Sequence, residues 1–398
     1  MNMLKMMLFG LALMWLSACG SPAEPIDSPT QPASAVAPST ASSPTGAVPA
    51  DSKMPTELSK IRTQIQAALD RYMDAMNRGD ETALANIVDQ DNLTFKRVQN
   101  DFLKSPAYSW KGRNPRGTVT QVQVVREPYV KVWLTETVRG NHIWIFKWSD
   151  RGWLVSEPDE EELGARTERE TDKFVVRYFE WDEALVDGVV KAVSEAVDAA
   201  VANTGRKAVA KFLVRMAPTF QTQSGRSGIG VAASYNSSAK MLSIRSPESF
   251  GGTFSGIGAV KSVPDIQHEF THLLVDEAIA PRGTIWWVNE AFAHYFTDDL
   301  RPATVRASLS NKVYSLKDLN QLEVEGGVQQ TDLYIRAQGT VAVQYMVEKL
   351  GGRDKAWAWL IAEAQIRDFN ESFNKVFGVT YDQFEKGWQE FMKQRYGG

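Results

Sequence analysis

The chain has 398 residues, of which 43% are hydrophobic and 23% charged, and its formal net charge is -4. This length is enough for two hydrophobic cores, so most of the chain is expected to be globular. Nucleic-acid-binding proteins usually carry a basic patch or stripe, and the small acidic net charge gives no indication of one, so no nucleic-acid partner is expected.

Residues 1–18 have the pattern of a secretory signal peptide. Lys5 is followed by "MMLFGLALMWL", an apolar run too short to span a bilayer. The run ends in "LSAC", where Cys19 is the only cysteine of the chain, which leaves no disulfides and no cysteine metal ligands. This ending resembles the lipobox of bacterial lipoproteins. The resemblance implies cleavage before Cys19, a lipid anchor on its sulfur and an extracytoplasmic place in the cell envelope; the alternative is a plain secretory signal.

Residues 19–55 are rich in Pro, Ser, Ala and Thr and contain no aromatic residue. Such a segment cannot bury enough apolar surface to offset its ordering entropy. We therefore expect a disordered tether between the membrane and the folded part.

Residues 56–160 predict a small α+β domain. Apolar residues at four-residue steps in "ELSKIRTQIQAALDRYMDAMNRG" indicate an amphipathic helix, and "ETALANIV" a second, shorter one. The strand-like runs that follow are "GTVTQVQVVRE", "YVKVWLTETV", "HIWIFKWSD" and "GWLVSE". Helices followed by an antiparallel meander resemble the cystatin-like fold of nuclear transport factor 2-like domains.

The aromatic residues of this domain allow two interpretations. Its five tryptophans either line a ligand pocket or fill the concave face of the sheet, and the second is expected because aromatics are strand and core residues. His142 has no acidic neighbour in the sequence and is expected to be structural. The tryptophans are Trp110, Trp133, Trp144, Trp148 and Trp153.

Residues 161–398 predict a second domain. The acidic run "EPDEEELGARTERE", residues 157–170, is typical of a solvated linker and marks the boundary. Beyond it, strand-like runs surround a long helix in "DEALVDGVVKAVSEAVDAAVANTG". After residue 262 nearly all of the chain is predicted to be helical, with loops at 279–284 and 316–331.

"HEFTH", residues 268–272, carries the chemistry of this domain. Residues i and i+4 share one face of a helix, so His268 and His272 can present two imidazoles to one ion. Glu269 lies one step round the helix, within reach of a water on that ion. "PRG", residues 281–283, ends the helix, and "WWVNEAFAHYFTD" predicts a second one carrying Glu290. An antiparallel return over this short loop brings Glu290 beside both histidines. Two histidines and one carboxylate with an open fourth position are typical of catalytic zinc.

These motifs resemble the gluzincin metallopeptidases, over roughly residues 170–398. The resemblance implies a thermolysin-like zincin domain with one Zn²⁺ per chain, ligated by His268, His272 and Glu290, and with Glu269 as the base. "DLYIRAQG" resembles the downstream tyrosine segment, which implies that Tyr334 stabilises the oxyanion. "AKMLSIRSPE" would be the edge strand that pairs with an extended substrate. Trp388, in the closing helix, and Tyr345 are expected in the core.

Two further residues can orient the ligands. Thermolysin-like enzymes carry an aspartate at the position of His294, which here either hydrogen-bonds to a ligand or is a packed helix histidine, with packing expected. Asp276, one turn after His272, is either an acid that orients a ligand or a solvated helix charge, and the sequence leaves both open.

The stretch 199–247 bears on the cleavage mode. The resemblance to the gluzincins implies, for the aminopeptidase-N relatives among them, an upstream acid that pairs with the free amine of the substrate. The stretch contains no Asp or Glu, so cleavage inside peptides is expected. Its seven basic residues either favour acidic peptides or form a solvated strand face. They are Arg206, Lys207, Lys211, Arg215, Arg226, Lys240 and Arg245.

The sequence therefore predicts a membrane-anchored, extracytoplasmic zinc peptidase that hydrolyses peptide bonds with a metal-activated water. Its partners would be a peptide or protein substrate and a bacterial membrane. The alternative is a catalytically silent binding module of the envelope, in which the N-terminal domain is the working part.

Overall fold

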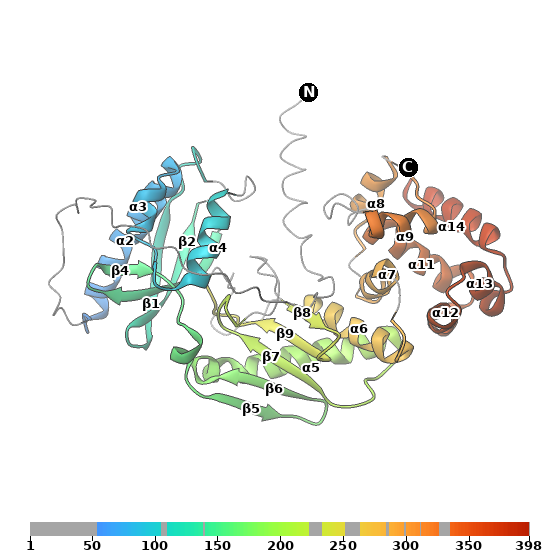
Figure 1. Ribbon diagram of the computed structural model, residues 1–398, viewed down its shortest axis with the longest axis horizontal. Helices are drawn as coiled ribbons and strands as arrows, with labels where there is room; N and C mark the ends of the chain where they lie inside the picture. Colours follow the sequence, from blue (N-terminus) through green and yellow to red (C-terminus); the bar gives the residue numbers. More distant parts are fainter. Residues whose placement is uncertain are drawn as a thin grey trace, which may run out of the picture.

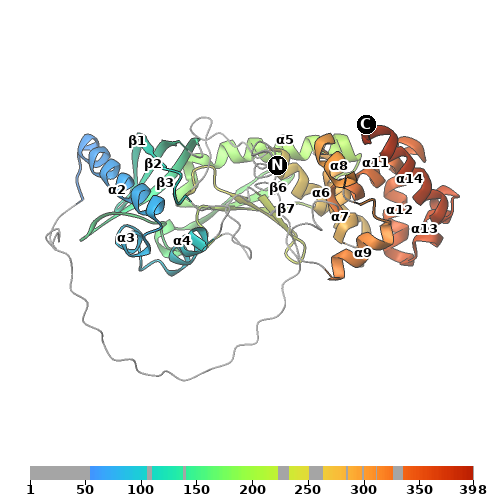
Figure 2. The same ribbon diagram turned by 90° about the horizontal axis from the view of Figure 1, so that it is seen from above.

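The computed structural model describes residues 54–104, 110–137, 140–222, 233–250, 263–283, 286–297, 300–310, 312–325 and 335–397. These residues form an N-terminal unit with its own sheet, a central second sheet and a helical C-terminal region, which follow one another along the long axis (Figures 1 and 2). The predicted α+β class is confirmed.

The N-terminal unit packs three helices and a four-stranded antiparallel sheet of order β1-β2-β3-β4 around one core. Helix α2 ends at Gly79, whose φ of 66° is a left-handed conformation that glycine adopts without strain. The predicted helices and strands are all present, and α4 is an addition. The elements are α2 (Leu58–Arg78), α3 (Glu81–Ala85), α4 (Leu93–Lys104), β1 (Gly117–Arg126), β2 (Tyr129–Glu136), β3 (Gly140–Ser149) and β4 (Gly152–Val155).

The tryptophans of this unit fill its interior. Trp110, Trp133, Trp144 and Trp153 are all buried, and Trp144 packs edge-to-face on Tyr72 with 4.9 Å between the ring centroids. The core interpretation is therefore confirmed for these four residues.

The second sheet has the order β5-β6-β7-β9-β8, in which β6, β7 and β9 are parallel and the two outer strands are antiparallel. The prediction that "AKMLSIRSPE" supplies the edge strand is wrong, because β9 lies between β7 and β8. Strand β8 forms that edge among the described residues. The strands are β5 (Arg166–Glu170), β6 (Phe174–Phe179), β7 (Phe212–Ala217), β8 (Ala233–Asn236) and β9 (Met241–Arg245).

Most of the chain from residue 263 on is helical, as predicted, but part of the loop predicted at 316–331 is helix α9. Residues 326–331 lie outside the described ranges. Trp388 is fully buried, which confirms its predicted place in the core. The helical elements of the second unit are η2 (Glu160–Leu163), η3 (Glu180–Leu185), α5 (Val186–Thr204), α6 (Val263–Ile279), α7 (Trp286–Phe296), α8 (Pro302–Leu309), α9 (Leu316–Glu325), the π-helical turn η4 (Ile335–Gly339), α11 (Thr340–Lys349), α12 (Gly352–Ile366), α13 (Phe369–Phe377) and α14 (Tyr381–Tyr396).

No helix in the described part of the chain combines the length and the apolar character that a membrane span requires.

The acidic run at 157–170 is not the solvated linker that its charge predicts. Glu157 is buried and accepts a hydrogen bond from the Phe220 amide at 3.0 Å, and residues 166–170 form β5. Burial raises the pKa of Glu157 to about 8. The run thus joins the two units through buried contacts.

A buried ion pair crosses the same junction. Lys131 on β2 donates from Nζ to Glu248 Oε2 at 3.0 Å, and both side chains are at most 6% exposed. Nearby, Asp182 accepts a hydrogen bond from Ser246 at 2.8 Å. Each buried charge of the Lys131–Glu248 pair therefore needs the other to offset its desolvation cost.

We expect Lys131→Met to lower the free energy of unfolding by about 3–5 kcal/mol, because it leaves the Glu248 carboxylate buried without its cation. The double variant Lys131→Met/Glu248→Leu should recover much of this loss. Arg116→Ala is the control: it breaks the exposed Arg116–Asp74 pair and should cost about 0–1 kcal/mol. Urea unfolding measures all three, and a Lys131→Met cost no larger than that of Arg116→Ala would contradict the expectation.

Candidate metal centre

Helix α6 presents the two histidines of "HEFTH" on one face. Residues 266–275 of this helix are all buried, because α6 packs against α5, α7 and the second sheet. His268 and His272 lie one turn apart with their Nε2 atoms 3.1 Å from each other and their rings nearly perpendicular. The predicted i and i+4 placement of the two imidazoles is therefore present.

Helix α7 brings Glu290 to these histidines. Its carboxylate is only 1% exposed, with Oε1 3.5 Å from His272 Nε2 and Oε2 3.7 Å from His268 Nε2. The helices α6 and α7 pack against each other, as predicted from the short loop between them. Three side chains from two helices thus converge at one buried point.

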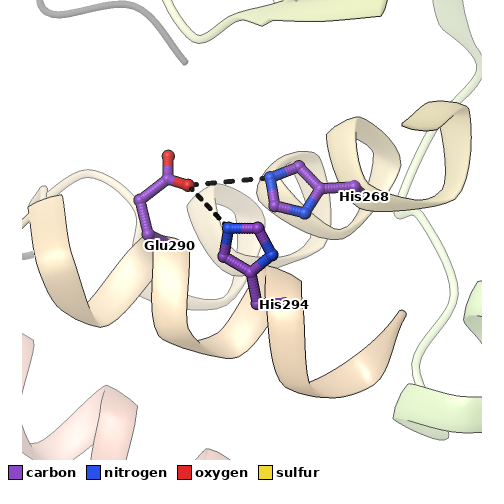
Figure 3. Close-up of side chains that lie close together, drawn as sticks. All are labelled: His268, Glu290 and His294. Atoms are coloured by element: carbon purple, nitrogen blue, oxygen red, sulfur yellow. Dashed lines mark ion pairs between the residues drawn. The ribbon is translucent and has the colours of Figure 1, made fainter. Parts of the chain in front are cut away.

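His294 belongs to the same cluster. It lies one turn after Glu290 on α7, and its Nε2 is 3.7 Å from Glu290 Oε2. The rings of His268 and His294 are 4.5 Å apart between centroids, and Figure 3 shows both rings turned toward the carboxylate. One ligand atom from each of His268, Glu290 and His294 can be chosen so that all three lie within 4.8 Å of one another. His294 thus packs against the His268 ring and also faces the Glu290 carboxylate.

Glu269 lies beside the cluster and is held by the second sheet. It is 3% exposed, and its Oε2 accepts a hydrogen bond of 2.7 Å from the backbone N–H of Tyr235. Tyr235 is part of β8, the edge strand. This contact has no signal in the sequence, because the donor is a backbone group whose position depends on strand order.

Asn289 orients one of the histidines. Its Oδ1 accepts a hydrogen bond of 2.8 Å from His272 Nδ1, which places the proton on Nδ1 and leaves the Nε2 lone pair toward Glu290 and His268. Asp276 was a candidate for such a role from its place in the sequence, whereas Asn289 was not, although it directly precedes Glu290. Burial raises the pKa of Asp276, and the charge of His272 is among the influences that lower it.

The donor set suits zinc. Burial lowers the pKa of His272, although the Glu290 charge opposes this, so the ring stays neutral as a metal ligand must. Zn²⁺ binds imidazole nitrogen and carboxylate oxygen at about 2.0–2.2 Å, which separates neighbouring ligand atoms of a tetrahedral site by about 3.3 Å. The separations of 3.1, 3.5 and 3.7 Å among His268, His272 and Glu290 are close to that value.

Other predicted residues are placed elsewhere or not described. Tyr334 and Cys19 lie outside the described residues. Tyr345 is partly buried and packs against the core through Phe384 and Phe391, with centroid distances of 5.5 and 5.6 Å, so it lies at the edge of the core in which it was expected.

Two of the basic residues in the described part of 199–247 bond to other groups of the protein. Arg245 is half-buried, donates to Ser249 Oγ at 2.8 Å and interacts electrostatically with Glu157. Lys211 forms an ion pair of 2.6 Å with Glu170. These two side chains contribute to the structure of the second unit.

No protein-family model matches this chain, and no curated protein sequence is similar to it. Among solved structures, Legionella pneumophila aminopeptidase A in complex with aspartic acid aligns with a TM-score of 0.31 and 16% identity over 56% of this chain and 27% of that one. Yeast LTA4 hydrolase in complex with bestatin aligns with a TM-score of 0.31 and 11% identity over 71% of this chain and 43% of that one. An M1 zinc metallopeptidase from Deinococcus radiodurans aligns with a TM-score of 0.28 and 11% identity over 69% of this chain and 60% of that one. The chain spans less than two thirds of the length of each, and at these TM-scores its function has to be inferred from its own site.

We expect Asn289→Leu to weaken zinc binding by about 10–100-fold, because His272 loses the acceptor that fixes its tautomer and ring orientation. Chelator competition on the purified protein measures this affinity. Asn203→Leu is the matched control, since it removes a hydrogen bond of 2.8 Å to Phe296 O at the end of the same helix. Equal zinc affinity of the Asn289 variant and this control would show that Asn289 does not orient the ligand.

Proposed function

We propose that this protein is a zinc-dependent peptidase. The observation that carries the proposal is the convergence of His268, His272 and Glu290 within 3.1–3.7 Å, with the Glu269 carboxylate next to His268 in the same helix. Two imidazoles and one carboxylate are the ligand set of many catalytic zinc sites, and an adjacent carboxylate that is not a ligand is the base that hydrolysis requires.

His268, His272 and Glu290 would hold the ion, one per chain. When bound there, zinc would supply a Lewis acid that polarises the scissile carbonyl and lowers the pKa of water. The neutral histidines and the buried Glu290 leave a net positive charge on such a centre.

Glu269 has the task of moving the proton. Its Oε2 accepts from the Tyr235 amide, which orients the carboxylate, and the carboxylate would take a proton from the attacking water and return it to the leaving amine.

The substrate would be an extended peptide. Strand β8 is an edge of the second sheet in the described part of the chain, and the same strand contacts Glu269, so a peptide added beside β8 would lie next to the base. This assigns to β8 the role that the sequence suggested for β9.

We infer that cleavage occurs inside peptides. The acids that flank the stretch 199–247 are Asp198 and Glu248. Asp198 forms an ion pair of 2.6 Å with Lys173, and Glu248 is buried in its ion pair with Lys131, so both are engaged within the protein. N-terminally blocked peptides should therefore be cleaved. Release of single residues from amino-acid anilides, with blocked peptides left intact, would contradict this inference.

A lipid anchor on Cys19 would place the enzyme outside the cytoplasmic membrane of a bacterium. The proposal is supported by the signal-like residues 1–18 and the "LSAC" context. Labelling with a palmitate analogue, compared between the intact chain and Cys19→Ser, tests it.

We expect Glu269→Gln to retain about one zinc per chain and to lose about 10²–10⁴ in kcat, because the amide oxygen can still accept from Tyr235 but the side chain no longer takes a proton. Elemental analysis and peptide hydrolysis are the measurements. Glu277→Gln is the matched control on the same helix: Glu277 also accepts a backbone N–H, from Val209 at 2.9 Å, away from the metal ligands. If Glu269→Gln emptied the site while Glu290→Ala left it full, the assigned roles would be reversed.

We expect Tyr334→Phe to lower kcat by about 10²–10³ with little change in KM or zinc content, because a hydroxyl that donates to the oxyanion acts mainly in the transition state. Tyr345→Phe should stay active, since Tyr345 packs on Phe384 and Phe391. Full activity of the Tyr334 variant together with an inactive Tyr345 variant would mean that the oxyanion role belongs to the other tyrosine.

A further inference from the structure

The cluster contains one more metal-binding side chain than the proposed peptidase site uses. Helix α6 contributes His268 and His272, and α7 contributes Glu290 and His294, each pair separated by four residues. Two helices that pack against each other thus each direct one i and i+4 pair toward the same point. The arrangement offers three imidazoles and one carboxylate.

The environment of His294 is that of a ligand. Its exposed fraction is 8%, the same as that of His268, and its Nε2 is as far from Glu290 Oε2 as the His268 Nε2 is, 3.7 Å in both cases. Figure 3 shows the two histidines on opposite helices with Glu290 reaching both. The printed contacts of Glu290 with the three histidines are 3.5–3.7 Å long, and His268, Glu290 and His294 offer ligand atoms within 4.8 Å of one another. Side-chain rotations would have to bring the ligand atoms to the spacing of about 3.3 Å expected around zinc.

We propose that His294 is a fourth protein ligand, so that the resting centre binds its metal through His268, His272, Glu290 and His294. This proposal rests on the zinc site of the proposed function and changes its character. Sites with four protein ligands are closed, whereas catalytic sites keep one position for water or substrate. His294 must therefore leave the ion, or remain as one of five ligands, before a peptide is hydrolysed.

The position of His294 makes such an exchange feasible. Among the other three side chains, His272 is oriented by its hydrogen bond to Asn289, and His268 Nε2 lies 3.7 Å from Glu290 Oε2 on the facing helix. His294 is near the end of α7, which stops two residues later at Phe296. A rotation of its side chain would open one coordination position without moving the helix that carries Glu290.

Zinc K-edge X-ray absorption on the full chain loaded with one equivalent of Zn²⁺ tests the proposal, because multiple scattering from imidazole rings counts the histidine ligands. We expect three imidazoles in the unaltered protein and two in His294→Gln, with zinc affinity at least 10-fold weaker in the variant. His142→Gln is the control. This variant removes the only other histidine of the chain, which lies in β3 of the N-terminal sheet. The zinc in it should still have three imidazole ligands.

Two imidazoles in the unaltered protein would overturn the proposal, whether or not the variant folds. The same number of imidazole ligands in His294→Gln as in the unaltered protein would also overturn it. Failure of the unaltered protein to bind zinc would overturn it as well. The outcome is separable from that of the proposed function. Three imidazoles without peptide hydrolysis would leave His294 a ligand and refute the peptidase, whereas hydrolysis with two imidazoles would do the reverse.

Discussion

The packing of α6 against α7 is the constraint on which the rest of the site depends. A helix repeats its facing direction about every four residues, so each of these helices can offer two ligands only along one stripe. The two ligand-bearing faces meet because only a short connection separates the end of α6 at residue 279 from the start of α7. The facing sides of both helices are buried. A shift of one helix by a single residue would turn its pair away and leave a buried carboxylate without the histidines.

The proposed base, Glu269, depends on a different part of the fold. Glu269 is carried by α6, but its orientation comes from the Tyr235 amide of β8, whose place is fixed by pairing with β9. The strand that would align a peptide is therefore the strand that holds the base. This coupling relates substrate position to proton transfer through one backbone hydrogen bond of 2.7 Å.

The sequence predicted the features that repeat within one turn or one strand. The four-residue spacing in α2 and in "HEFTH" and the alternating runs of the N-terminal sheet all have local signals. Strand β5 had no local signal, because nearly all of its side chains are exposed and charged. Its sequence therefore has the same pattern as a solvated linker. Strand order and the Asn289 and Tyr235 contacts depend on how distant segments pack. Helix α4 did have a local signal, since the Asn92 side chain accepts from the Phe95 amide at its start.

The burial of the cluster has an energetic consequence. The Glu290 carboxylate is 1% exposed, so its burial between the histidines costs desolvation free energy. A divalent cation at that point compensates the charge, so the free energy of metal binding also stabilises the contact between α6 and α7. The same two helices pack against the second sheet and against α11 and α12, so the metal would connect the sheet side of the molecule to its helical side. Catalytic geometry and the stability of this junction would then depend on the same four side chains.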